Sequence, residues 1–208
     1  QNKAGTDSTG LPGDNFSLQG ALAMFKKAGN PEEFEKLINA EDNGVNNLDL
    51  NEDGEKEFVR VIDKADNDVH AFVLQVAISE KESQDIAVIE LEKTGDQEAM
   101  VQIIGDEDIY GEQVIVEPGD DGNAYIEQFE ETVTTGPYIN ERAIIVNVWF
   151  WPSVRFIYGP VYRPYMSAWR WRHYPAWWRP WRPVGWYAFR PRFYHYHRPF
   201  VVVHTHRV

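Results

Sequence analysis

The sequence predicts an α+β protein: an N-terminal helical hairpin packed on an antiparallel β-meander sheet, followed by an irregular tail rich in Trp, Arg, Tyr and Pro. Three observations support this fold class. Apolar residues recur at helical spacing in residues 17–39, and β-branched runs separated by turn clusters fill residues 57–116. All acidic residues precede Arg142, whereas all 8 tryptophans follow it. The expected parts are a mobile leader (1–15), an acidic α+β domain (16–151) and a basic aromatic, Pro-rich tail (152–208).

Two short helices are expected first. Ser17 is a favourable N-cap residue, an apolar stripe with helical spacing follows it, and Gly29 ends the helix. Asn30 and Pro31 then begin a second helix, because proline is favoured at the first helical position. The two helices are expected to form a hairpin that packs on the following segment.

The next part of the chain has the spacing of strands. Runs rich in β-branched residues alternate with short turn clusters, which favours antiparallel hairpins because a parallel crossover needs about a dozen residues or more. The expected strands are 57–63, 69–78, 86–92, 99–104 and 113–116. The apolar run 143–151 is expected to be a buried strand that could complete the sheet.

Residues 49–57 have the spacing of a calcium-binding loop. Oxygen-bearing side chains alternate along the loop and Gly54 allows its tight turn, as a hard cation such as Ca²⁺ requires. The bidentate Glu that an EF-hand has at position twelve is replaced by Arg60, so the loop resembles those of dockerin, thrombospondin and integrin-type repeats. The alternative is a turn stabilised by Asx side chains and glycine without metal. The predicted ligands of a weak calcium site are Asp49, Asn51, Asp53, Glu55 and Glu57.

Charge divides the chain into two parts. Before Arg142 there are 9 basic and 33 acidic residues, a formal charge of −24, and from Arg142 onward there are 11 arginines and no acidic residue. The tail also holds 20 of the 29 aromatic residues and 8 of the 12 prolines, which disfavour a continuous helix or an interior strand. The two parts are therefore potential partners for each other.

Such a tail has several potential uses. Arginine stacks on aromatic rings and binds carboxylates or phosphates, so the tail could fold back on the acidic domain. It could lie at a membrane surface, since residues 177–183 resemble Trp/Arg/Pro-rich membrane-active peptides of the indolicidin type. It could stack on sugars or single-stranded nucleic acid, although the acidic domain would repel nucleic acid. It could also be an irregular, self-packed extension. The residues expected to contact a partner are Trp169, Arg170, Trp171, Arg172, Trp177, Trp178, Arg179, Trp181 and Arg182.

Catalytic motifs are not evident. The chain has no cysteine and no nucleotide-binding glycine loop. His70 alternates within a predicted strand and is expected to be a packing or edge residue. The pairs 195/197 and 204/206 of histidines are expected to be exposed rather than metal-binding, because no carboxylate or thiol lies near them in sequence. An enzyme with a carboxylate site remains an alternative.

Residues 30–63 resemble a set of exported proteins of Bacteroidota-type Gram-negative bacteria. The shared patterns are Pro-Glu-Glu-Phe-Glu-Lys-Leu-Ile-Asn, Val-Asn-Asn-Leu-Asp-Leu-Asn-x-Asp-Gly and Val-Arg-Val-Ile-Asp, and the tail is similar in composition. That set has no established activity, so the resemblance implies only a periplasmic or outer-membrane-associated location. We also expect that a signal peptide was removed before Gln1, and no apolar run reaches the ~20 residues of a transmembrane helix.

These observations predict a non-enzymatic exported cell-envelope protein whose tail docks on a protein or membrane-surface partner. One form of this hypothesis is an accessory subunit of an outer-membrane assembly, whose tail becomes ordered on the partner. A calcium-binding module that uses residues 49–57 is the first alternative, and an enzyme is the second. Because the tail is expected to be an appendage, a chain ending at Gly136 is expected to stay folded and soluble.

Overall fold

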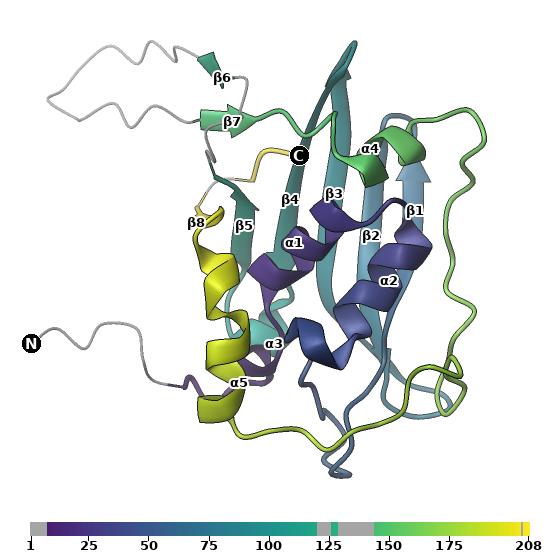
Figure 1. Ribbon diagram of the computed structural model, residues 1–208, viewed down its shortest axis with the longest axis vertical. Helices are drawn as coiled ribbons and strands as arrows, with labels where there is room; N and C mark the ends of the chain where they lie inside the picture. The colour runs from purple at the N-terminus through teal and green to yellow at the C-terminus, as the bar shows by residue number, and fades with distance from the viewer. Residues whose placement is uncertain (1–7, 120–125, 129–143, 205) are drawn as a thin grey trace, which may run out of the picture.

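The computed structural model describes residues 8–119, 126–128, 144–204 and 206–208, and it confirms the α+β fold (Figure 1). Its centre is an antiparallel sheet of six strands in the order β1-β2-β3-β4-β5-β8. Helices α1 (Leu18–Lys27) and α2 (Pro31–Asn39) pack against one face of this sheet. In the described part of the chain the longest helix, α1, has 10 residues, and no helix is long and apolar enough to cross a bilayer.

The two N-terminal helices begin at the predicted caps. The Ser17 side chain accepts a hydrogen bond from the Gly20 N–H at 2.9 Å, and Asn30 accepts one from the Glu33 N–H at 2.8 Å. Each bond satisfies an amide that has no partner inside its helix. The buried side of α1 carries Phe25. The predicted helical hairpin is therefore confirmed.

The first five strands form the predicted meander, because each pairs with the next one along the chain. Along β2 the buried side chains of Phe72, Leu74 and Val76 alternate with positions on the other face. A short helix, α3 (Glu107–Tyr110), lies between β4 and β5. The strands are β1 (Val59–Asp66), β2 (Val69–Ala77), β3 (Ser83–Gly95), β4 (Glu98–Gly105) and β5 (Val114–Pro118).

The sixth strand comes from the tail. Strand β8 (Phe200–Val203) pairs with β5 at the edge of the sheet. The prediction that run 143–151 completes the sheet is wrong: β7 (Ile144–Val146) pairs instead with β6 (Ile126–Gln128) in a separate two-stranded sheet. Asn147 ends β7, since its side-chain oxygen accepts hydrogen bonds from the N–H groups of Ala99 and Trp149 at 3.1 and 3.0 Å.

The hydrophobic core extends into the tail. Trp151 packs on Phe25, with ring centroids 6.4 Å apart, and Phe25 also contacts Phe34 and Phe72. Helix α4 (Pro152–Ile157) follows, and its Ser153 hydroxyl donates a hydrogen bond to the Phe25 carbonyl at 2.7 Å. The buried residues on either side of position 151 thus belong to one core.

Beyond α4, residues 158–185 form what we term the strap. It descends beside β1, passes the end of the molecule and continues into α5 (Trp186–Phe193) next to β5 and β8 (Figure 1). The Ser167 N–H donates to the Val61 carbonyl at 3.0 Å, and the Asp63 N–H donates to the Tyr165 carbonyl at 2.7 Å. The strap therefore pairs with β1, the strand at the opposite edge of the sheet from β8, and the tail folds back on the acidic domain.

The described part of the predicted leader, residues 8–15, is ordered. Residues 1–7 lie outside the described part of the chain, whereas the next residues form a turn in which the Asp14 carboxylate accepts hydrogen bonds from the hydroxyls of Ser8 and Thr9. The 3₁₀ helix η1 (Pro12–Asn15) follows. A Cβ on Gly13 would lie 2.4 Å from the ring of Tyr110, so this close approach requires glycine.

Candidate functional site

The predicted calcium loop forms a turn that hydrogen-bonds to itself. The Asp49 carboxylate accepts hydrogen bonds from the N–H groups of Asp53 and Gly54 at 3.1 and 3.0 Å. The Asn51 side chain also accepts from the Asp53 N–H at 3.0 Å, and the Asp53 carboxylate accepts from the Glu55 N–H at 2.9 Å. These are the side-chain to backbone bonds of Asx turns.

Glu57 points into the loop. Its carboxylate accepts hydrogen bonds from the Leu50 N–H at 2.8 and 2.9 Å and from the Asn51 N–H at 3.1 Å. Burial raises the pKa of Glu57 above its usual value, and these two amides lower it in part. Glu55, in contrast, is exposed. Among the described residues, no three His, Cys, Asp or Glu side chains are arranged to hold a metal ion, so calcium at this loop stays a prediction.

The structure brings the loop and the predicted partner-binding segment together. The Lys56 N–H donates a hydrogen bond to the Trp181 carbonyl at 2.8 Å. Next to it, the Trp178 ring lies edge-on to the Phe58 ring at 5.3 Å, and Tyr174 lies 4.6 Å from Trp178. The strap is therefore anchored at the end of the loop by an aromatic cluster and a backbone hydrogen bond.

The predicted partner-binding residues differ in exposure according to residue type. Trp178 is 5% exposed, whereas its neighbour Trp177 is 41% exposed. The remaining tryptophans of the segment are half-buried. The four arginines of the segment are all exposed: Arg170, Arg172, Arg179 and Arg182. In the described part of the chain none of their guanidinium groups forms an ion pair with a carboxylate.

A tight turn holds part of this segment in place. Arg170 and His173 exchange two backbone hydrogen bonds, at 3.2 and 2.8 Å. Arg172 lies inside the turn with φ 57°, in the left-handed region. Its guanidinium carbon is 4.3 Å from the Trp171 ring centroid, and that of Arg179 is 5.9 Å from the Trp181 centroid. The rings thus restrict the arginine side chains by cation–π contact.

A buried polar cluster was not predicted. His70 Nδ1 lies 2.8 Å from Asp63 Oδ2, and the Tyr162 hydroxyl donates to the same oxygen at 2.7 Å. The other oxygen, Oδ1, is buried and has no hydrogen-bond partner among the described residues. His70 is buried as a packing residue would be, but its bond to Asp63 was missed. The β1–β2 register could have predicted this contact. When Asp66 pairs with Val69, the side chains of Asp63 and His70 lie diagonally opposite each other on one face of the sheet.

A second buried carboxylate also contacts the strap. The Tyr165 hydroxyl donates to Glu35 Oε1 at 3.0 Å, and the Val61 N–H donates to Oε2 at 2.8 Å. Burial raises the pKa of Glu35 above its usual value, although these hydrogen bonds and one from Ser167 lower it in part. Two acidic residues of the domain therefore bind tyrosines of the strap, which assigns them a structural role.

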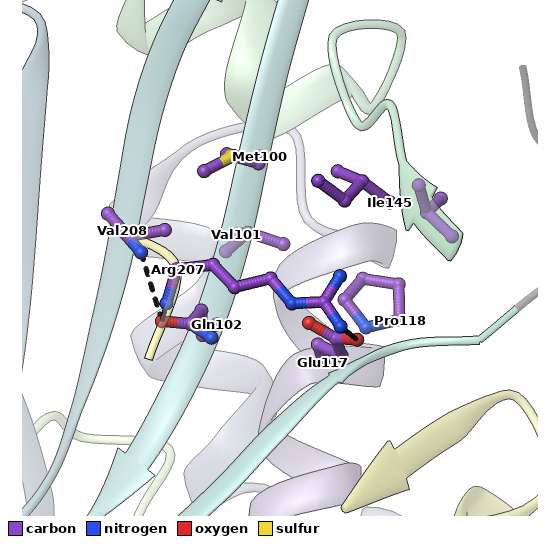
Figure 2. A pocket seen from close by; sticks show the side chains of 9 residues that line it. Met100, Val101, Gln102, Glu117, Pro118, Ile145, Arg207 and Val208 are labelled. Carbon is purple, nitrogen blue, oxygen red and sulfur yellow. Dashed lines mark hydrogen bonds and ion pairs between the residues drawn. The ribbon is translucent and has the colours of Figure 1, made fainter. Parts of the chain in front are cut away.

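The C-terminus is fastened to the sheet face opposite the helices (Figure 2). Gln102 alternates with the core residues Val101 and Ile103, and its side-chain oxygen accepts hydrogen bonds from the N–H groups of Arg207 and Val208 at 3.0 and 3.2 Å. The Arg207 guanidinium forms an ion pair with Glu117 at 3.1 Å. Of the predicted exposed histidines, His206 contacts the Glu90 carboxylate. These contacts attach the last residues to β3, β4 and β5.

Comparison of the chain with protein-family models, with curated proteins and with solved structures gave no match. The fold defines an α+β protein with a six-stranded antiparallel sheet whose basic tail wraps around the helical layer and supplies an edge strand. The function is therefore argued from geometry and charge.

Proposed function

We propose that this is a non-enzymatic exported protein of the cell envelope that docks on a partner, a protein or a membrane surface, through the arginines of residues 169–182. The observation that carries the proposal is that the tryptophans and the arginines of this segment differ in exposure. Trp178 is buried against the domain and three further tryptophans are half-buried, whereas the four arginines are exposed. An accessory subunit of an outer-membrane assembly is one form of this function.

Anchoring favours binding by these arginines. A guanidinium group binds carboxylate or phosphate through two parallel hydrogen bonds. Ordering a free, arginine-rich segment would oppose binding by about 0.5–1.5 kcal/mol for each immobilised side chain. The aromatic cluster around Trp178 and the turn at Arg172 have already ordered this part of the backbone. Part of the entropy loss of ordering this segment therefore occurs when the protein folds and does not oppose binding.

The charge distribution orients the partner. Residues 1–141 carry a formal charge of −24, and residues 142–208 carry +11. An anionic partner is attracted by the exposed arginines and repelled by the acidic domain, which favours one docking orientation. Exposed apolar side chains also lie elsewhere on the strap, since Val161 is 76% and Met166 is 73% exposed. Aromatic residues, methionine and arginine are enriched at interfaces.

The test replaces the charges and leaves the tryptophans intact. The quadruple variant R170Q/R172Q/R179Q/R182Q is compared with a control that removes four exposed charges elsewhere, K27Q/K64Q/K81Q/R198Q. Binding is measured to vesicles with and without phosphatidylglycerol, and to a solubilised envelope fraction. We expect the quadruple variant to lose at least about tenfold in affinity for one of these, which corresponds to ~1.4 kcal/mol, while the control binds like the wild type. Equal binding by the quadruple variant and the wild type in both assays would overturn the proposal.

A further inference from the structure

A cleft of about 350 Å³ lies between the N-terminal segment and α5. Its volume is within the ~300–1,000 Å³ range of small-molecule sites. One wall is a single helical stripe of α5 and the 3₁₀ helix η3 (Tyr194–His197), because the lining residues recur at intervals of four, three, one and three. That stripe consists of Trp186, Arg190, Phe193, Tyr194 and His197.

The walls of the cleft are held by contacts outside it. Phe189, on the buried side of α5, packs on Phe193 with ring centroids 4.8 Å apart. The Tyr196 hydroxyl donates to the Asn43 carbonyl at 2.8 Å and fixes η3. Across the cleft, the Tyr110 hydroxyl donates to the Phe16 carbonyl at 2.8 Å. Both walls are therefore preorganised rather than formed on binding.

Aromatic rings and charges of both signs line the cleft. The Arg190 guanidinium carbon lies 5.6 Å from the Trp186 ring centroid and 4.9 Å from the Tyr194 centroid. The carboxylates of Asp14 and Glu112 and the amide of Gln19 lie on the other walls. A ligand in this cleft therefore meets hydrogen-bond donors, acceptors and ring faces together.

We infer that this cleft binds a neutral sugar ring. Hydroxyl groups both donate and accept, so a sugar can donate to Glu112 and accept from Arg190. The apolar C–H face of a pyranose fits on an indole or phenol ring, whose face is electron-rich. Two carboxylates and one guanidinium leave the lining with a small net negative charge, which opposes an anionic ligand. The site uses none of residues 169–182, so it is independent of the proposed docking surface.

The imidazole of His197 fits a neutral ligand. Partial desolvation, and secondarily the charge of Arg190, lowers the pKa of His197 below its usual value. Both effects favour the neutral ring, which presents one donor and one acceptor nitrogen. This protonation state complements hydroxyl groups better than an anion.

The test uses the full chain and a panel of neutral sugars: glucose, galactose, N-acetylglucosamine, cellobiose and chitobiose. Binding is detected by saturation-transfer NMR and quantified by calorimetry. We expect at least one sugar to bind, with the affinity reduced at least about tenfold in both W186A and Y194A, since loss of a stacked ring removes ~1.4 kcal/mol or more. The control is F150A, because Phe150 is an aromatic residue that is 57% exposed and not part of the lining, and the affinity of this variant should match the wild type.

A second variant, at Glu112 on the wall of the cleft opposite α5, tests the inference even if substitutions in α5 unfold the helix. E112Q keeps the size of the side chain and should weaken the same sugar about tenfold without changing α5. Acetate and inorganic phosphate are titrated as anionic probes. Binding of these anions without any sugar, absence of binding by every sugar in the panel, or equal loss in F150A and W186A would each overturn the inference.

Discussion

The acidic domain and the tail are ordered by different kinds of contact. In the domain, β1 to β5 pair with neighbours in the chain, and local spacing predicts them. The tail is held by contacts between residues far apart in sequence: Tyr165 bonds to Glu35 across 130 positions, and Val184 bonds to Asn47 across 137. Order in the tail is therefore a property of the folded domain that it covers, and composition alone does not show it.

Deleting the tail tests this comparison with the largest expected effect. The composition predicts that a chain ending at Gly136 stays folded, but the contacts lead us to expect the opposite. Trp151, Val154 and Ile157 are members of the core, and each buried side chain contributes ~1.5–3 kcal/mol. Their loss, with that of β8, is large relative to a total stability of ~5–15 kcal/mol. We expect aggregation, or a circular dichroism spectrum without cooperative unfolding. A soluble, cooperatively unfolding product would support the two-part interpretation instead.

Neighbouring tryptophans of the strap offer a sharper comparison. Trp178 is buried against Phe58 and Tyr174, whereas Trp177 is 41% exposed. We expect W178A to lower the free energy of unfolding by ~3–5 kcal/mol, because it leaves a cavity. W177A should lower it by less than ~1 kcal/mol. Urea titration measures both. Equal effects of the two variants would mean that the strap does not hold Trp178 in the observed position.

The buried Glu35 predicts a pH dependence of the link between domain and strap. Burial raises its folded-state pKa above 4.5, so the folded protein binds this proton more tightly than the unfolded chain. Its contribution to the free energy of unfolding therefore falls as pH rises from 4.5 through the folded pKa. E35Q does not ionise, and it keeps both contacts when its amide oxygen accepts from the Val61 N–H and its amide N–H donates to the Tyr165 hydroxyl. Its stability relative to wild type should therefore increase across this window, by ~1.4 kcal/mol for each unit of the shift.

The control for this prediction is E80Q, which removes an exposed carboxylate that is not among the groups acting on Glu35. The gain in relative stability with pH should be specific to E35Q. Thermal unfolding at several pH values between mildly acidic and neutral measures both variants. If the stability of E35Q relative to wild type falls as pH rises, then Glu35 is not destabilised by burial in the folded protein.

Calcium is expected to have the smallest effect. The Glu57 carboxylate is bonded to the amides of Leu50 and Asn51, and Arg60 replaces the bidentate ligand. We expect millimolar calcium to stabilise the protein by at most ~1 kcal/mol, since a weak site near its dissociation constant contributes little. D53N should abolish that effect, and D106N, at the N-cap of α3 outside the loop, should retain it. A calcium effect of several kcal/mol would show that the loop rearranges around the ion.

Local patterns predicted the helices and the first five strands because their signals lie within the segments themselves. Ser17 and Asn30 are caps, and alternating β-branched residues define β2. Helix α5 and strand β8 of the tail were missed. Helix α5 contains Pro191, which normally disfavours a helix interior, and β8 has four residues within an Arg-, His- and Pro-rich context. Their order depends on pairing with β5 and on burial of Phe189 and Phe200.

For the predicted sites, too, local patterns located the residues but did not show their contacts. Spacing located the oxygen-bearing side chains of residues 49–57, but it did not show that they would bond to their own backbone amides. Composition located the Trp/Arg segment, but not that Trp178 faces the domain while Arg170 and Arg182 face outward. The cluster of Asp63 and His70 with Tyr162 joins residues up to 99 positions apart, a contact that no local pattern predicts.

The central claim is that the strap belongs to the fold of the isolated chain, and amide hydrogen exchange on the purified full-length protein tests it most directly. Specific amides report on the attachment: Ser167 donates to Val61, and Val184 donates to the Asn47 side chain. We predict that both exchange slowly, together with the strand amides of β1. Rapid exchange at Ser167 and Val184, with the sheet still protected, would show that the tail is not held by its own domain and would contradict the account.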